Sequence, residues 1–222
     1  MRILLVMHEC NSSYNVFPYG IGYLAAALRN GGHSVTIFDQ ATGHYSDKEL
    51  YSFIKSEKPF GFIGMGFQGA YFHTAHGACK AVKDACGNTP LVLGGAAPSA
   101  SPAYILEKFN ADYVLTGEAD QSILAFSSAL ESNEGFDEVS GLCWKQDGDI
   151  RLSPRREPPI DLDALPFPAW DLFDMKSYTF PARQAGVNGL VKQIGILTSR
   201  GCPFTCKFCY RMEQGYRLRS IE

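Results

Sequence analysis

Three cysteines near the C-terminal end of the sequence have a spacing that suits a metal centre. Cys202, Cys206 and Cys209 form a C-x3-C-x2-C loop. Three thiolates on a short loop can hold three corners of an iron–sulfur cube and leave the fourth iron open for chemistry. Zinc would need a fourth ligand, which Cys143 could supply only from a distant element, and three buried free thiols are the remaining alternative. We therefore expect the three cysteines to ligate a [4Fe–4S] cluster.

The other four cysteines are scattered. Cys10, Cys79, Cys86 and Cys143 have no ligand spacing to one another, and a total of seven resists complete pairing into disulfides. Cys79 and Cys86 fall on one predicted helix, two turns apart, so their Cα atoms would be ~10 Å apart, beyond the reach of a disulfide. We expect all four to be small apolar residues or unreactive thiols in a cytoplasmic protein.

The composition is that of a globular chain. Its 222 residues are 45% hydrophobic and 19% charged, which excludes a disordered chain and a coiled coil. Twenty Lys and Arg against 23 Asp and Glu give a formal net charge of −3, so the chain has no basic field for nucleic acid or for a membrane surface. No apolar run approaches the ~20 residues of a membrane helix. We therefore expect a small-molecule substrate.

The first 130 residues alternate strand and helix patterns. Short apolar runs bounded by Gly, Pro or Asn predict buried strands at 3–7, 35–39, 60–66, 91–94 and 113–116. Amphipathic stretches predict helices at 21–30, 47–57, 71–86, 102–109 and 121–131. Serial β-α units imply right-handed crossovers and helices on both faces of the sheet. Residues 1–135 therefore predict a flavodoxin- or Rossmann-like α/β domain with a doubly wound, five-stranded parallel sheet.

The pattern changes after about residue 136. Residues 140–145 and 150–153 flank Asp147 and Gly148, a pair typical of a two-residue hairpin turn. Five prolines between Pro154 and Pro168 predict an extended linker. Residues 193–198 predict a further strand that runs directly into the cysteine loop. We therefore expect a hairpin and linker at 136–190 and the start of a second domain at 191–222.

The cysteine loop resembles the signature of the radical S-adenosylmethionine enzymes. Phe208 precedes the third cysteine, and the strand predicted at 194–198 matches the first strand of that family's partial TIM barrel. The resemblance implies that S-adenosylmethionine chelates the open iron, that Phe208 contacts its adenine, and that one-electron cleavage gives a 5′-deoxyadenosyl radical. It also implies an electron donor such as flavodoxin or ferredoxin. Because further barrel strands are missing, we expect the N-terminal portion of a longer enzyme, inactive alone.

Most of residues 1–175 resembles the cobalamin-binding domain that precedes this barrel in one subfamily. The matching segments are 17–26, 32–35, 93–99, 116–120 and the linker 165–171. A large flat cofactor docks at the carboxyl edge of a parallel sheet, where the loops diverge. The resemblance implies that cobalamin is bound by residues on or near these loops, namely Tyr19, Gly20, Gly66, Phe67, Gln68, Gly94, Gly95, Ala97, Ser99, Gly117 and Glu118.

The chain departs from this resemblance at two points. Ala96 and Ala97 stand within the family's Gly-Gly-Pro-His-Pro stretch, so one polar contact is missing. The sequence also has no Asp-x-His-x-x-Gly motif, which implies cobalt bound without a protein imidazole.

Plainer interpretations stand beside several of these residues. The loop glycines are also what strand-to-helix turns of any flavodoxin-like domain require. Glu118 is a candidate helix cap, and His8, at the end of the first strand, is a candidate cofactor contact. His73 and His76 lie one turn apart and favour a half-exposed helix face over a metal site.

Together the resemblances imply a cobalamin-dependent radical enzyme. The reaction most typical of the family is methyl transfer to an unactivated carbon: the radical abstracts a hydrogen atom from the substrate and methylcobalamin delivers the methyl group. Oxidative ring closure, as in anaerobic porphyrin cyclases, is a second reaction of the same family. A non-catalytic corrinoid-binding module is the alternative from another class, and the cysteine loop argues against it.

Overall fold

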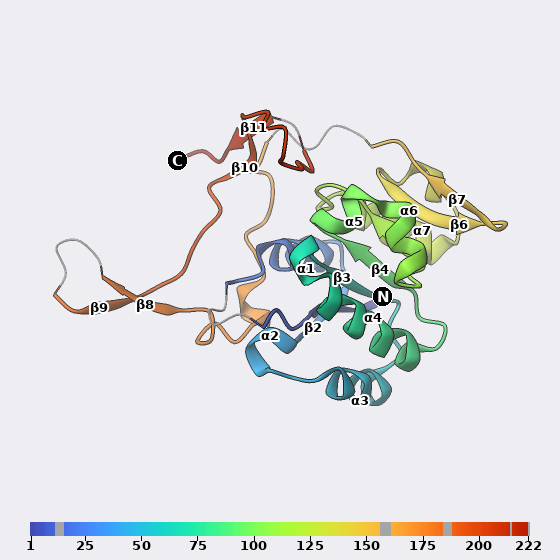
Figure 1. Ribbon diagram of the computed structural model, residues 1–222, viewed down its shortest axis with the longest axis horizontal. Helices are drawn as coiled ribbons and strands as arrows, with labels where there is room; N and C mark the ends of the chain where they lie inside the picture. The colour runs from blue at the N-terminus through green and yellow to red at the C-terminus, as the bar shows by residue number, and fades with distance from the viewer. Residues whose placement is uncertain (12–15, 156–160, 184–187, 214, 222) are drawn as a thin grey trace.

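A seven-stranded sheet forms the centre of the protein in the computed structural model, which describes residues 1–11, 16–155, 161–183, 188–213 and 215–221 (Figure 1). Its strand order is β2-β1-β3-β4-β5-β6-β7. The first five strands pair in parallel, which confirms the doubly wound parallel sheet expected from the sequence. They are β1 (Arg2–Met7), β2 (Ser34–Asp39), β3 (Phe62–Gly66), β4 (Leu91–Gly94) and β5 (Tyr113–Leu115).

The predicted hairpin extends this sheet. Strands β6 (Leu142–Gln146) and β7 (Asp149–Leu152) add to β5 in antiparallel fashion. Asp147 and Gly148 between them have φ values of 53° and 90°, the left-handed conformation that a two-residue hairpin turn requires. The lateral edge of the sheet at β7 is therefore formed by residues that follow the β-α units in the sequence, and β2 forms the other lateral edge.

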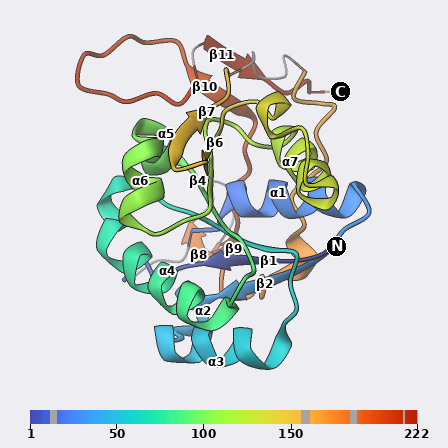
Figure 2. The same ribbon diagram turned by 90° about the vertical axis from the view of Figure 1, so that its right-hand side faces the viewer.

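Helices cover both faces of the sheet (Figure 2). Alternate residues of β1 enter two separate cores: Leu4 and Val6 pack in one, and Ile3 and Leu5 pack in the other. The first core lies under α3 (Asp47–Glu57), α4 (Phe72–Cys86) and α6 (Pro102–Lys108). The second lies under α1 (Tyr19–Asn30), α7 (Ser122–Ser132) and the segment around η3 (Trp170–Leu172). The remaining short helices are α2 (Gln40–Gly43), α5 (Ala96–Ala100), η1 (Gly69–Tyr71) and η2 (Phe136–Glu138).

Two small antiparallel pairs follow the sheet. Strand β8 (Phe180–Arg183) pairs with β9 (Leu190–Gln193) and extends away from the sheet in Figure 1. Strand β10 (Ser199–Cys202) pairs with β11 (Gly215–Leu218), and these two strands flank the cysteine loop. Between the two pairs, residues 194–198 form no strand, and Ile196 is 66% exposed.

The strand predicted at 193–198 is therefore wrong. An apolar run becomes a strand only where neighbouring strands offer hydrogen-bond partners. In the described part of the chain, Gln193 still pairs with Phe180 as the end of β9. Pairing resumes where the Arg219 amide donates to the Thr198 carbonyl at 2.8 Å and Ser199 lies opposite Leu218. Within the described residues, no helix combines the length and apolar character needed to cross a bilayer.

Candidate functional site

The carboxyl edge of the parallel sheet gathers most of the predicted cofactor contacts. Gly66 ends β3 and Gly94 ends β4, and the two are partners in the register of these strands. Phe67 and Gln68 follow β3, Gly95 and the short helix α5 follow β4, and Gly117 lies just beyond β5. Because parallel strands end at one edge, residues from three loops meet there.

Gly95 joins two of these loops through their backbones. It has a φ of +89°, and a Cβ atom placed there would lie 3.1 Å from both the amide nitrogen and the carbonyl oxygen of Phe67. The Phe67 amide donates to the Gly94 carbonyl at 3.2 Å, and the Ala97 amide donates to the Phe67 carbonyl at 3.2 Å. The positive φ and the close approach both favour glycine, so the loops after β3 and β4 lie backbone against backbone at this edge.

Ser99 connects the loop after β4 with the loop after β5. Its Oγ accepts a hydrogen bond from the Gly117 amide at 2.9 Å. Gly117 has a φ of +75°, and a Cβ atom there would lie 2.3 Å from atoms of both Arg155 and Glu213. The structure thus surrounds Gly117 with protein side chains from two later segments.

Tyr19 and Gly20 begin helix α1, which follows β1 and covers the face of the sheet opposite to α4 and α6. Gly20 is exposed, and a Cβ atom there would meet nothing within 4 Å. A Cβ atom at Gly195 would lie 2.7 Å from the Tyr19 hydroxyl, so the segment after β9 passes directly over this helix start. Burial raises the pKa of Tyr19 and keeps its phenol protonated.

His8 follows β1 directly and is buried beside the predicted cofactor contact Phe67. Its Nδ1 lies 3.0 Å from the Glu9 carbonyl oxygen and 3.4 Å from the Thr74 hydroxyl. The rings of Phe67 and Tyr71 pack against it. Burial lowers the pKa of His8, which favours the neutral imidazole. His8 is therefore neutral at pH 7 and part of the packed edge.

The two helical histidines lie on the first turns of α4. His73 is exposed and His76 is half-buried against the ring of Phe109. Neither belongs to a group of three potential metal ligands in the described part of the chain.

The predicted cluster ligands lie on the loop between β10 and β11. Cys202 ends β10 and is half-buried, whereas Cys206 and Cys209 are exposed. The Cys209 amide donates to the Cys206 carbonyl at 3.2 Å, which forms a turn between them, and Phe208 is 93% exposed. Three thiols are the donor set that an iron–sulfur cluster with an open iron requires. Among the described residues, however, no three His, Cys, Asp or Glu side chains converge, so a cluster would draw these thiols together on binding.

The four scattered cysteines differ from the loop cysteines. All four are free thiols; Cys79, Cys86 and Cys143 are buried and Cys10 is half-buried. Burial raises the pKa of each, in the case of Cys10 to about 11 with help from Glu9 and Asp39. A thiol that stays protonated is a poor nucleophile and a poor metal ligand. The expectation that these four cysteines are unreactive agrees with the structure.

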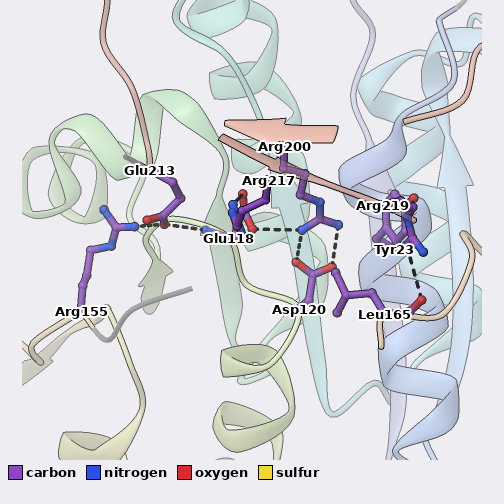
Figure 3. Close-up of polar contacts among 9 residues, drawn as sticks. All are labelled: Tyr23, Glu118, Asp120, Arg155, Leu165, Arg200, Glu213, Arg217 and Arg219. Carbon is purple, nitrogen blue, oxygen red and sulfur yellow. Dashed lines mark hydrogen bonds and ion pairs between the residues drawn. The ribbon is translucent and has the colours of Figure 1, made fainter. Parts of the chain in front are cut away.

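A cluster of charged residues joins the cysteine hairpin to the loop after β5 (Figure 3). Asp120 accepts two hydrogen bonds from the Arg200 guanidinium, at 2.5 and 3.1 Å. Glu118 lies 3.3 Å from Arg200 and also pairs with Arg217. Burial acts against the charged form of Arg200, but Asp120 and Glu118 outweigh it and raise its pKa. Glu118, predicted as a cofactor contact or helix cap, is thus engaged by two arginines.

The sequence analysis missed the arginine partners in this cluster. Arg200 precedes the cysteine loop and Arg217 follows it, and nothing in the sequence around either residue marks it as a partner of these carboxylates. The available signal was the pair of carboxylates at Glu118 and Asp120 directly after a buried strand. Acidic side chains that are 10% and 7% exposed need cationic partners, and arginine is the residue suited to bidentate pairing with a carboxylate.

Residues 10–127 match the B12-binding domain family. The chain belongs to this family. The match begins just after β1 and ends within α7, so it includes the predicted cobalamin contacts from Tyr19 to Glu118, whereas His8 lies before it. The glycine-lined edge is therefore that of a B12-binding domain.

Two curated relatives extend the comparison beyond the B12-binding domain. The chain is 29% identical to cytidylyl-2-hydroxyethylphosphonate methyltransferase of Streptomyces wedmorensis over 93% of its own length and 46% of the relative. It is 28% identical to the anaerobic magnesium-protoporphyrin IX monomethyl ester cyclase of Synechocystis sp. over 86% of its length and 37% of the relative. The chain therefore spans less than half the length of either relative.

Two solved structures share the fold over 99% of the chain. One is the radical S-adenosylmethionine methyltransferase TsrM of Kitasatospora setae, solved with cobalamin and a [4Fe–4S] cluster, with a TM-score of 0.72 and 18% identity over 43% of that protein. The other is the cobalamin-dependent S-adenosylmethionine radical enzyme OxsB with aqua-cobalamin bound, with a TM-score of 0.74 and 18% identity over 30% of that protein. The resemblance expected from the sequence is thus confirmed at the level of the fold.

Proposed function

We propose that this chain is the cobalamin-binding and cluster-ligating portion of a cobalamin-dependent radical S-adenosylmethionine methyltransferase. The observation that carries the proposal is the attachment of a C-x3-C-x2-C loop to the carboxyl edge of a B12-binding domain. Arg200, two residues before Cys202, pairs with Glu118 and Asp120 in the loop after β5. The methyltransferase relative supports methyl transfer as the reaction.

The residues of the chain divide between two binding tasks. Cobalamin would lie against the edge formed by Tyr19, Gly20, Gly66, Phe67, Gln68, Gly94, Gly95, Ala97, Ser99 and Gly117. Cys202, Cys206 and Cys209 would hold three irons, and Phe208 would face S-adenosylmethionine at the fourth. When bound, the reduced cluster and S-adenosylmethionine supply a radical that abstracts hydrogen from an unactivated carbon, and cobalamin supplies the methyl group. A cytoplasmic donor such as flavodoxin or ferredoxin would provide the electron.

Oxidative cyclisation is the second candidate reaction. The anaerobic cyclase of Synechocystis sp. matches 86% of this chain, nearly as much as the methyltransferase relative. Both reactions would use the same cobalamin edge and the same three cysteines. Binding of cobalamin and of an iron–sulfur cluster therefore tests what the two candidate reactions share. Uptake of iron separates both of them from a corrinoid-binding module without a cluster.

Iron content after anaerobic reconstitution tests the cluster. We expect about four irons per chain in the full-length enzyme, from the stoichiometry of a [4Fe–4S] cluster. Replacing Cys202, Cys206 or Cys209 with Ala should remove most of that iron, whereas Cys143→Ala should retain it because Cys143 is buried in strand β6. Tight binding of one zinc in place of iron, or loss of iron in Cys143→Ala alone, would contradict the proposal.

A further inference from the structure

Two arginines face each other across the cysteine hairpin. Strands β10 and β11 are antiparallel, and their register places Arg200 opposite Arg217. Residues directly opposite each other in such a pair project to the same face, where like charges destabilise the pairing. The hairpin that carries Cys202 therefore needs carboxylates on this face to remain closed.

Glu118 and Asp120 supply these carboxylates from the loop after β5. Asp120 takes both Nη atoms of Arg200, and Glu118 lies between the arginines with one oxygen on each. The four side chains are only 7 to 15% exposed. Each of these carboxylates pairs with a guanidinium group that is itself largely buried, so loss of Asp120 or Glu118 weakens the charge compensation of a buried arginine.

Further contacts hold the C-terminal end of the same hairpin. The Ser220 amide donates to the Asp163 carboxylate at 3.0 and 3.1 Å. The guanidinium of Arg219 lies 5.7 Å from the ring centre of Tyr23 on α1, and that of Arg200 lies 4.7 Å from the same ring. The Ser220 contact is exposed, whereas Tyr23 is buried and adds to the hold on Arg200. Glu213, in the same hairpin, also accepts from the Glu118 amide at 3.2 Å and pairs with Arg155, so the carboxylate cluster is one of two largely buried attachments to the loop after β5.

We propose that Glu118 and Asp120 are positioning residues that fix the cysteine loop over the carboxyl edge beside β5. The role of this attachment in catalysis rests on the proposed function, but the attachment itself needs no cofactor. The Gly117 amide, next to Glu118, is bonded to Ser99 Oγ. The same short loop therefore connects a predicted cobalamin contact with the strand that ends in Cys202.

Hydrogen exchange of the cofactor-free chain, read by mass spectrometry, tests the attachment. In Asp120→Asn and in Glu118→Gln, the amides of β10 and β11 should exchange about tenfold faster or more, because each variant leaves a buried arginine without its full charge partner. The amides of β1 to β4 should keep their rates. Asp84→Asn is the matched control, since Asp84 forms an exposed pair with Lys80 on α4.

Two further variants distinguish positioning from general destabilisation. Asp120→Glu keeps the charge and should keep the protection of β10 and β11. The exchanged pair Asp120→Arg with Arg200→Asp should regain protection that Asp120→Asn loses. Failure of this rescue, or unchanged exchange in both Asp120→Asn and Glu118→Gln, would overturn the proposal.

Iron release adds a readout specific to the loop. The reconstituted Asp120→Asn chain should lose iron to a chelator faster than the Asp120→Glu chain, and equal rates would count against positioning. The proposed function fails separately: a chain that takes up neither cobalamin nor iron would refute it, and the exchange experiment would still decide the attachment.

Discussion

At the scale of single residues, Gly95 is a position of the carboxyl edge where an added side chain would meet protein backbone. Both its φ of +89° and the 3.1 Å approach to the Phe67 backbone require the absence of a side chain. Gly87, at the end of α4, provides a comparison: its φ of +66° also favours glycine, but a Cβ atom there meets nothing within 4 Å. At both positions the backbone conformation would strain any other residue, but only at Gly95 would the added side chain also meet protein backbone.

Cobalamin binding should distinguish these two glycines. Gly95→Leu should weaken cobalamin binding by about tenfold or more, because a side chain there would press on the Phe67 backbone and displace the loops that form the proposed cobalamin edge. Gly87→Leu carries the same kind of strain at the opposite end of the sheet and should bind like the wild type. The visible spectrum of cobalamin retained after gel filtration measures both. Retention by Gly95→Leu, or absence of uptake by the folded wild-type chain, would contradict the site.

The sequence predicts the glycines of the site better than its ion pairs. A glycine directly after a buried strand signals a backbone constraint from local sequence alone, as at Gly94 and Gly95. The partners Asp120 and Arg200 lie 80 residues apart, and their meeting depends on how the hairpin lies on the sheet. Nothing local to Arg200 distinguishes it from a solvated arginine.

At the scale of elements, local signals decided which predictions succeeded. Helix α3 has its predicted bounds because a capping box at Ser46 and Glu49 defines its start. Within the predicted strand at 193–198, Gln193 pairs with Phe180 in β8, but residues 194–198 form no strand in the described chain despite their apolar pattern. The five parallel strands and the five longer helices all lie within two residues of their predicted bounds. A helix satisfies its own backbone hydrogen bonds, whereas a strand depends on partners elsewhere, so the failure at 194–198 could not be recognised from the run itself.

Helix α3 offers a test of the packing that holds the sheet. Leu50 is fully buried in the core shared by α3, α4 and the sheet, so Leu50→Ala should lower the free energy of unfolding by about 2–5 kcal/mol. Lys48 is exposed on the same helix, and Lys48→Ala should change it by no more than about 0.5 kcal/mol. Urea denaturation followed by circular dichroism measures both values. Equal effects of the two substitutions would show that α3 does not pack as described.

At the scale of the whole molecule, the carboxyl edge is dense with contacts between elements distant in sequence. His8 illustrates this, because its ring touches the loop after β3, helix η1 and helix α4. Burial lowers the pKa of His8 from its ordinary value of 6.5, although Glu9 and Asp47 act in the opposite direction. The unfolded chain therefore binds a proton at this residue more readily than the folded chain does.

Stability should consequently depend on pH through His8. Its contribution is fully present above the ordinary imidazole pKa of about 6.5 and is lost as the pH falls below it. Between pH 7.5 and pH 5 the wild type should lose more free energy of unfolding than His8→Gln, as measured by urea denaturation at each pH. His73→Gln, at an exposed position on α4, should keep the wild-type slope. Parallel pH profiles for the wild type and His8→Gln would refute this assignment.

Buried ion pairs join the loop after β5 to the cysteine hairpin through Glu118, Asp120, Arg200 and Arg217. They also limit how a B12-binding domain from one protein can be joined to the cysteine segment of another. A cobalamin domain transplanted from one enzyme onto the cysteine segment of another brings its own residues after β5, and the recipient keeps its own arginines. If only one side carries its charges, the junction buries an unpaired ion. Substitutions on the two sides should therefore be inherited together, and a chimera should be cut so that all four residues come from the same parent.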